Sequence, residues 1–199
     1  MPDTTNDQSP PARRRRVPRA EARLRLIDAT ITLLRTLPFD EVGNQAICAE
    51  ADLNPSTILQ HFGTLDNLLG ETAKELVRRH VEAAVASGTQ PTTFGDPDVE
   101  LRTRLVAWLI LKGVDPDELR SGVVENEAVI AYQTTMLGVG PRTAIAWTTL
   151  TTLLVEAYSV FAPTHRLAPN NVADVLDLLA LVRDGLPDAE QRLGWSEKG

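Results

Sequence analysis

The chain of 199 residues carries a net charge of −7, and 43% of its residues are hydrophobic. This apolar content suffices for a buried core, so disorder along the whole chain is excluded. The single cysteine, Cys48, rules out an internal disulfide and suits a reducing compartment. No apolar stretch approaches the roughly 20 residues of a membrane span, so we expect a cytoplasmic protein without a membrane partner.

The charge is distributed unevenly. Residues 1–25 contain seven arginines and three acidic residues, a local charge of +4, so the remaining chain carries −11. Four of these arginines are consecutive: Arg13, Arg14, Arg15 and Arg16. A basic end on an acidic body is typical of a chain that binds a polyanion, although the run could also serve only to keep the chain soluble. Residues 1–18 lack apolar periodicity, and we predict that they form a disordered basic arm.

Helical periodicity follows the arm. Apolar residues at intervals of three and four predict one face of a first helix over about 21–37. The residues of this face are Leu24, Ile27, Ile31 and Leu34. A short second helix follows, with Asn44 as the expected N-cap. Its inward residues are Ile47, Cys48 and Ala51.

Turn and capping residues then mark two more helices. Asn54 is predicted to cap a third helix, 55–62, whose first position is a proline that needs no hydrogen-bond partner there. Gly63 permits a left-handed turn after this helix. Thr64 is the expected cap of a fourth helix over about 65–86.

The clearest internal break is the segment 87–98, which is rich in glycine, proline and threonine. Beyond it, helical patterns separated by glycine, proline and asparagine resume. The helices predicted there span 99–112, 116–122, 123–137, 141–161 and 170–186. Sustained alternation of apolar and polar residues is absent from the sequence, so we predict an all-α fold.

Two short helices joined by a four-residue turn, after a longer packing helix, form a helix-turn-helix. Spacing alone is a weak indication of DNA binding, because helical corners of this kind are common in other proteins. The residue identities add to it, in register over residues 23–69. They are Phe39, Ile47, Ala51, Leu53, Pro55, Ser56, Thr57, Ile58, His61, Phe62, Gly63, Thr64, Asp66, Leu68 and Leu69. In this order they resemble the N-terminal domain of the TetR/AcrR family of transcriptional regulators.

The resemblance implies a helix-turn-helix DNA-binding domain over residues 19–69 and a larger helical ligand-binding and dimerisation domain over 70–199. It also implies a homodimeric repressor that binds a palindromic operator and is released by a small-molecule effector. An alternative is a helical binding protein with the same fold but weakened or lost DNA affinity. An enzyme is the less favoured alternative, because the sequence contains no phosphate loop and no paired nucleophile and base. We expect no catalytic residue, cofactor or bound metal.

The sequence also departs from the family pattern. Leu59 stands where these proteins usually carry a tyrosine that contacts phosphate, and Leu65 stands where a lysine is usual. Gly43 replaces a capping threonine, so that Asn44 is the expected substitute, and Pro38 replaces a glycine after the first helix. Leu59 and Leu65 are compatible with burial, with a partner contact or with a degenerate DNA site.

The predicted DNA contacts are mostly uncharged, because residues 36–73 contain no lysine or arginine. Base reading is therefore assigned to neutral polar side chains of the third helix and its start. They are Asn54, Ser56, Thr57, Gln60 and His61. We expect phosphates to meet backbone N–H groups at the helix starts marked by Asn44, Asn54 and Thr64, and positive charge to come from Arg13–Arg16.

The C-terminal half offers candidates for an effector site and a dimer interface. A pocket for an apolar or amphipathic effector would have aromatic walls, although core packing explains the aromatic residues equally well. The candidates are Trp108, Tyr132, Trp147 and Tyr158. Two apolar stripes predict a four-helix dimer interface. The first comprises Leu150, Leu153, Leu154, Ala157 and Phe161, and the second Val172, Val175, Leu176, Leu179 and Val182, with Leu178 and Leu181 on a further face.

Overall fold

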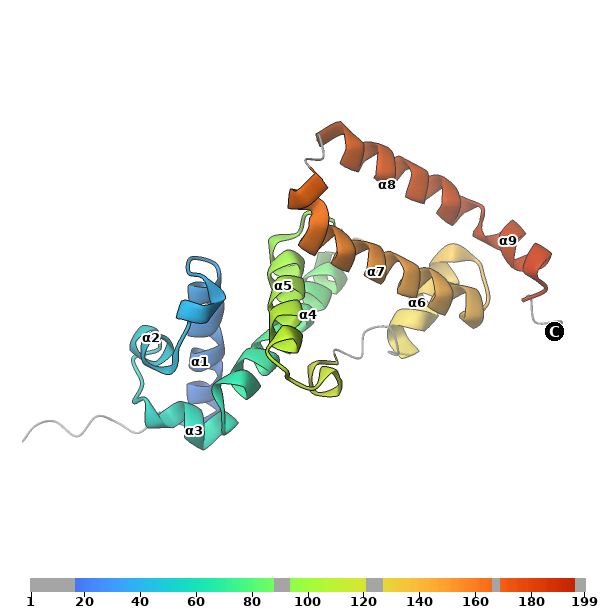
Figure 1. The fold of residues 1–199 in the computed structure, drawn as a ribbon. Coiled ribbons are helices and arrows are strands. Elements are labelled where there is room, and N and C mark those ends of the chain that lie inside the picture. Colours follow the sequence, from blue (N-terminus) through green and yellow to red (C-terminus); the bar gives the residue numbers. More distant parts are fainter. Residues whose placement is uncertain (1–16, 88–93, 121–126, 166–168, 196–199) are drawn as a thin grey trace, which may run out of the picture.

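The computed structural model describes residues 17–87, 94–120, 127–165 and 169–195. All regular structure within these ranges is helical, which confirms the predicted all-α fold (Figure 1). The α-helices are α1 (Arg19–Leu34), α2 (Asn44–Glu50), α3 (Ser56–Phe62), α4 (Leu65–Ser87), α5 (Pro97–Leu111), α6 (Glu127–Leu137), α7 (Pro141–His165), α8 (Pro169–Asp184) and α9 (Leu186–Leu193). Two short 3₁₀ helices are η1 (Phe39–Glu41) and η2 (Pro116–Leu119).

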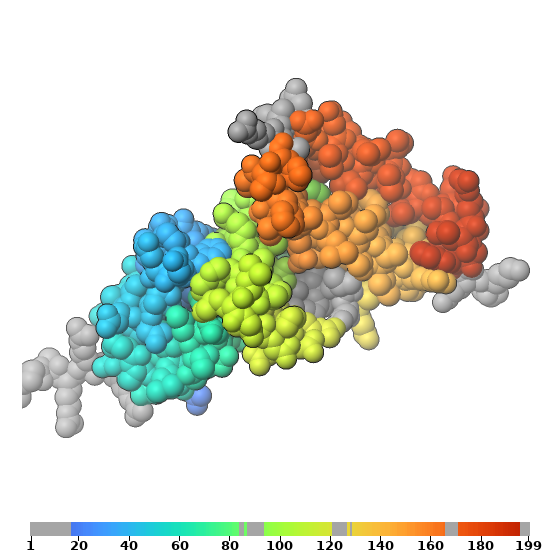
Figure 2. Space-filling model, in the orientation of Figure 1, coloured from blue at the N-terminus to red at the C-terminus, as the bar shows by residue number. Residues whose placement is uncertain are grey.

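One hydrophobic core joins α1 to α5. Its largest fully buried side chains include Leu26, Ile47, Ile58, Leu68, Leu69, Leu76, Leu105 and Leu109. The fourth helix contributes to both ends of this core, since its first turns pack on α3 and its later turns lie against α5. The predicted domain boundary between residues 69 and 70 therefore falls inside α4, a single continuous helix. Figure 2 shows the molecule as a space-filling view in the same orientation as Figure 1.

The inner face of α1 differs from the prediction at one position. Leu24 is exposed, whereas Leu26 is completely buried. Thr30 also lies in the core, although it is polar. Its burial is tolerated because its hydroxyl donates a 2.7 Å hydrogen bond to the Leu26 carbonyl. With Thr30 counted as buried, the buried face centres on Thr30, and Leu24 lies outside it.

The C-terminal helices form a looser arrangement around α7. Helix α7 packs on α5 and α6, whereas α8 crosses above it and has no fully buried residue among its described side chains (Figure 1). The last predicted helix, 170–186, corresponds to α8, which ends at Asp184, and a further helix that the sequence did not predict, α9, begins at Leu186. Helix α9 is fixed by buried Glu190, whose carboxylate oxygens accept hydrogen bonds of 2.9 and 3.1 Å from the Gly140 N–H.

Helix α7 is long and apolar enough, by length and composition, to cross a membrane. One such helix is weak evidence for a membrane span, because core helices of soluble proteins share this composition. Several of its polar side chains are buried and bonded within the helix, as in the 2.8 Å hydrogen bonds from Thr148 to the Ala144 carbonyl and from Ser159 to the Val155 carbonyl.

Candidate nucleic-acid interface

The turn between α2 and α3 reverses the chain in a few residues. Asp52 has a positive φ of 51°, a conformation that aspartate tolerates better than most residues. The Leu53 N–H then donates a 2.9 Å hydrogen bond to the Cys48 carbonyl and closes the end of α2. The two helices thereby pack on α1 and on each other around Ile47 and Ile58.

Asn54 caps the start of α3, as predicted. Its Oδ1 accepts hydrogen bonds from the Ser56 N–H at 3.0 Å and from the Ser56 hydroxyl at 2.9 Å. Pro55 already has helical backbone angles, although regular α3 begins at Ser56. A cap that satisfies a free N–H in the first turn fixes the direction in which α3 leaves the turn.

The predicted capping role of Asn44 is wrong. Gly43 occupies the N-cap position of α2 in an extended conformation, and its carbonyl accepts the first helical hydrogen bond from Ile47 at 3.1 Å. Asn44 is the first helical residue, and no side chain caps this end. The physical reason is that glycine adopts the extended cap conformation readily, so the helix starts one residue earlier than the asparagine suggested. Asn44 is exposed, and a role in DNA contact stays a prediction.

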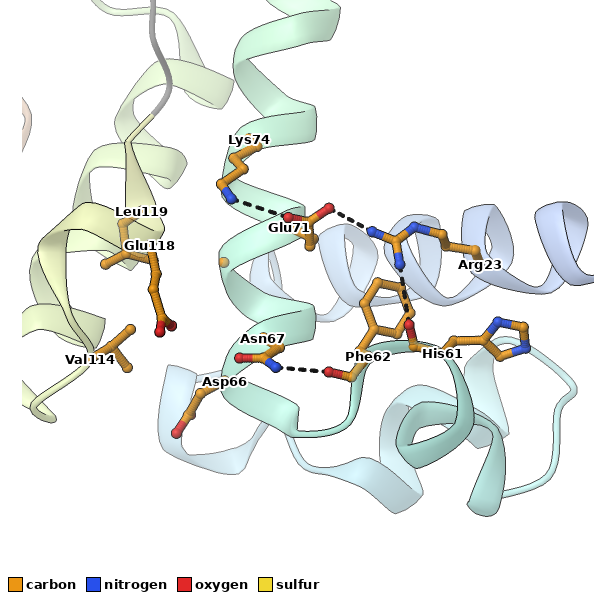
Figure 3. A pocket seen from close by; sticks show the side chains of 11 residues that line it. Arg23, His61, Phe62, Asp66, Asn67, Glu71, Lys74, Val114, Glu118 and Leu119 are labelled. Atoms are coloured by element: carbon orange, nitrogen blue, oxygen red, sulfur yellow. Dashed lines mark hydrogen bonds and ion pairs between the residues drawn. The ribbon is translucent and has the colours of Figure 1, made fainter.

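The last carbonyls of α3 are held by two other helices (Figure 3). Arg23 of α1 donates a 3.2 Å hydrogen bond to the His61 carbonyl, and its guanidinium lies 4.4 Å from the ring centroid of Phe62. The same guanidinium forms a 2.5 Å ion pair with Glu71 of α4. Asn67 of α4 donates a 2.8 Å hydrogen bond to the Phe62 carbonyl. Helix ends leave such carbonyls without helical partners, so these contacts anchor α3 between α1 and α4.

The anchoring contacts line one side of a cleft of about 340 Å³ between the N-terminal helices and η2 (Figure 3). Its charged side chains include Arg23, Glu71, Lys74 and Asp66, and each is in an ion pair. Lys74 pairs with Glu71 at 3.1 Å, and Asp66 pairs with Lys112 at 2.8 Å. These ion pairs hold the helices together, and the cleft is also lined by the exposed carboxylate of Glu118.

The outward face of α3 carries most of the residues predicted to read bases. Ile58 and Phe62 are buried against α1 and α4, so the opposite face points to solvent. Its exposed side chains are Ser56, Leu59 and Gln60, and Asn54 at the helix start is also exposed. Thr57 and His61 are half-buried at the edges of this face. The structure thus brings the five predicted base-reading residues together on one short helix and its cap.

His61 is only partly accessible to solvent. Its Nδ1 atom is buried and has no hydrogen-bond partner among the described residues. Burial lowers the pKa of the imidazole, and the charges of Arg19 and Arg23 lower this pKa further. Both effects favour the neutral ring, which can offer one donor or acceptor but no positive charge to DNA.

The start of α4 agrees with the sequence prediction. Gly63 has a φ of 78°, and the Thr64 hydroxyl oxygen accepts a 3.1 Å hydrogen bond from the Asn67 N–H. Leu65 is half-buried and packs against the core, so its side chain serves packing. Leu59, in contrast, is exposed.

The basic arm is only partly described. Arg13–Arg16 lie outside the described residues, and their DNA contacts stay a prediction. Two other arginines of residues 1–25, Arg23 and Arg25, form contacts within the fold. Arg23 anchors α3, and Arg25 pairs with Glu21 at 2.5 Å.

The four aromatic residues proposed for an effector site do not share one pocket. Trp108 packs edge to face on Phe39, with ring centroids 5.9 Å apart, and therefore joins α5 to the N-terminal core. Tyr132 is exposed on α6, and Trp147 is half-buried on α7. Tyr158 alone lines an open apolar hollow of about 320 Å³ between α7 and α8. The other side chains that line it include Phe94, Leu154, Phe161 and Val175.

The proposed dimerisation stripes are largely uncovered. Most of their leucine, valine and phenylalanine side chains are exposed on α7 and α8. These residues are Leu150, Leu153, Leu154, Phe161, Val175, Leu176, Leu178, Leu181 and Val182. Apolar surface of this extent on neighbouring helices is typical of an interaction site.

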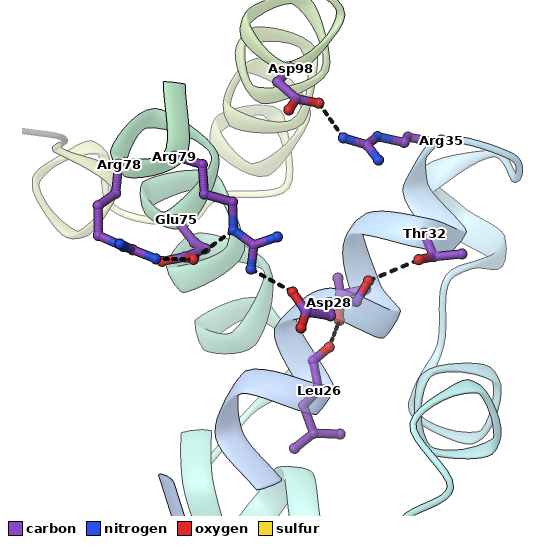
Figure 4. Close-up of polar contacts among 9 residues, drawn as sticks. Leu26, Asp28, Thr32, Arg35, Glu75, Arg78, Arg79 and Asp98 are labelled. Carbon is purple, nitrogen blue, oxygen red and sulfur yellow. Dashed lines mark hydrogen bonds and ion pairs between the residues drawn. The ribbon is translucent and has the colours of Figure 1, made fainter. Parts of the chain in front are cut away.

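Polar contacts connect α1 to α4 and α5 (Figure 4). Asp28 of α1 pairs with Arg79 of α4 at 2.5 Å, and Arg79 also bonds to Glu75 at 2.7 Å. Arg35, directly after α1, pairs with Asp98 of α5 at 2.5 Å. Such partly exposed pairs add little stability individually, but they link the N-terminal helices to the helices that support the C-terminal half.

Neither a family model nor a curated protein matches this chain. No group of three or more histidine, cysteine, aspartate or glutamate side chains suited to a metal ion occurs in the part of the chain that the structure describes.

Proposed function

We propose that the chain is a transcriptional regulator of the TetR/AcrR type, which binds DNA as a homodimer and leaves its operator when a small molecule binds. The observation that carries the proposal is the outward polar face of α3 on a helix whose two ends are fixed by Asn54, Arg23 and Asn67. A major groove about 12 Å wide admits an α-helix of this kind. An anchored helix presents its side chains to base edges in a constant geometry, which sequence reading requires.

The exposed side chains of α3 suit base reading without positive charge. Gln60 can pair bidentately with adenine, and the Ser56 hydroxyl can donate or accept. Thr64 at the start of α4 and the arginines Arg13–Arg16 are assigned to phosphates. In this arrangement the arm supplies affinity and the helix supplies specificity.

Dimer formation is assigned to the apolar surface of α7 and α8. Pairing of these helices with their twofold copies would bury side chains such as Leu153, Leu178 and Leu181, which are exposed in the single chain. A twofold dimer presents two copies of α3, and its half-sites on DNA are related by the same symmetry. The operator is therefore expected to be palindromic.

The effector is assigned to the apolar hollow beside Tyr158, and its class is apolar or amphipathic. Helix α4 connects the two halves, so a ligand that shifts α5 and α7 can change the position of α3 through α4. Because linkage is reciprocal, operator DNA must weaken effector binding by the same factor by which the effector weakens DNA binding.

Recovery of a preferred sequence from random double-stranded DNA tests the proposal. The full chain is expected to enrich one palindromic sequence. Gln60→Glu places a carboxylate on the exposed face of α3 and is expected to weaken binding at least about tenfold, because it removes the bidentate pair and is repelled by phosphates. Gln191→Glu on exposed α9 is the matched control, because it adds the same charge away from α3. Failure to enrich any sequence would favour the alternative, a helical binding protein without DNA affinity.

A further inference from the structure

An apolar side chain lies in the middle of the otherwise polar outer face of α3. Leu59 is 71% exposed, and within α1 to α4 the only other exposed large apolar side chain among the described residues is Leu24, at 50%. Surface leucines are common singly, but this one lies on the face that the proposed function directs to DNA. Its neighbours there are exposed Ser56, one helical turn before it, and exposed Gln60.

The position of Leu59 restricts what it can contact. Ile58 and Phe62 hold the opposite side of the helix in the core, so rotation of α3 cannot bury Leu59 within its own subunit. Arg23 and Asn67 fix the end of the helix against such a rotation. If α3 occupies a major groove, Leu59 meets base edges together with Ser56 and Gln60.

We propose that Leu59 is a specificity-determining residue that contacts the 5-methyl group of a thymine in each half-site. This inference rests on the proposed function. The thymine methyl is the only apolar group that the four base pairs present in the major groove. Leucine cannot donate or accept a hydrogen bond, so at the same position a guanine or cytosine would bury polar edge atoms without partners. Leu59 thus favours thymine by apolar contact with its methyl group, and it disfavours guanine and cytosine by leaving their polar edge atoms without partners.

Deoxyuridine provides a selective test, because it differs from thymidine only by the missing methyl group. On the operator recovered from random DNA, thymines are replaced one position at a time, symmetrically in both half-sites. At one position, the dissociation constant of the wild-type dimer is expected to rise about fourfold per methyl, or about sixteenfold for the two half-sites. Leu59→Ala should bind the thymine and deoxyuridine operators equally. Because Leu59 is exposed, this substitution leaves the fold intact.

Two control variants separate Leu59 from its neighbours. Leu24→Ala shortens the other exposed leucine and should keep the full sensitivity to deoxyuridine. Thr57→Ser removes the methyl group of the half-buried threonine on α3, and it should also keep the sensitivity. The inference is overturned if no position responds in the wild type, if the response persists in Leu59→Ala, or if it disappears in Thr57→Ser. Those results leave the proposed function standing, whereas the absence of any recovered operator removes both.

Discussion

The exposed apolar surface of α7 and α8 predicts that a single charged residue on α8 separates the dimer. Leu181 is 71% exposed in the single chain, so most of its side-chain surface remains to be buried by a partner. Full burial of a leucine side chain contributes about 1.5–3 kcal/mol, and the uncovered part of Leu181 then contributes about 1–2 kcal/mol. Since a twofold interface contains the residue twice, removing both leucines costs about 2–4 kcal/mol.

Leu181→Glu should therefore raise the dimer dissociation constant about 30-fold to 1000-fold, before any cost of burying the carboxylate is added. Sedimentation velocity over a concentration series measures this constant directly. Leu111→Glu is the matched control, because Leu111 is 88% exposed at the end of α5 and is not part of the proposed α7 and α8 interface. An unchanged dissociation constant for Leu181→Glu, or an equal increase for Leu111→Glu, would refute the assignment of the interface to α8.

Three further predictions concern the N-terminal helices. Arg23→Met keeps the apolar stem of the side chain but removes the hydrogen bond to the His61 carbonyl at the end of α3. It should lower the free energy of unfolding, measured in urea, by about 1–2 kcal/mol, whereas the control Arg25→Met should lower it by less than about 0.5 kcal/mol. Because the pKa of His61 is lowered in the folded protein, the unfolded chain takes up a proton first as the pH falls, and the free energy of unfolding should decrease below about pH 6.5. His61→Gln should make the free energy of unfolding depend less steeply on pH in this range. Burial raises the pKa of the Cys48 thiol, so a thiol reagent should label it only after opening or unfolding, with a labelling rate that rises in urea.

Capping residues made the N-terminal helices predictable from sequence. Asn54 and Thr64 each satisfy backbone N–H groups within three residues, so the signal is local and the sequence contains it completely. Gly43 and Thr30 show the limit of such reasoning. The extended conformation of Gly43 is a backbone property that a side-chain rule does not describe, and Thr30 is buried only because it bonds to its own helix.

Long-range contacts could not be predicted in the same way. The guanidinium of Arg23 meets the His61 carbonyl 38 residues later in the chain and Glu71 48 residues later, and no periodicity connects these positions. Trp108 is a candidate for the effector site by its aromatic side chain, but its partner is Phe39 of the N-terminal core. Composition identifies aromatic and charged residues, whereas their partners depend on how the helices pack.

The roles of the arginines change the electrostatic argument for DNA binding. Of the seven arginines in residues 1–25, Arg23 is hydrogen-bonded to the end of α3, and Arg25 is ion-paired with Glu21. Arg19 has no ion pair within the described ranges, so the charge available to phosphates reduces to Arg19 and the run Arg13–Arg16. For every phosphate that the run neutralises, its deletion should reduce the slope of log K against log salt by about 0.9. Since α3 contributes no cation, a protein without residues 1–16 should keep its base preference while its affinity depends far less on salt. An unchanged salt slope after this deletion would show that the phosphates are held elsewhere on the protein.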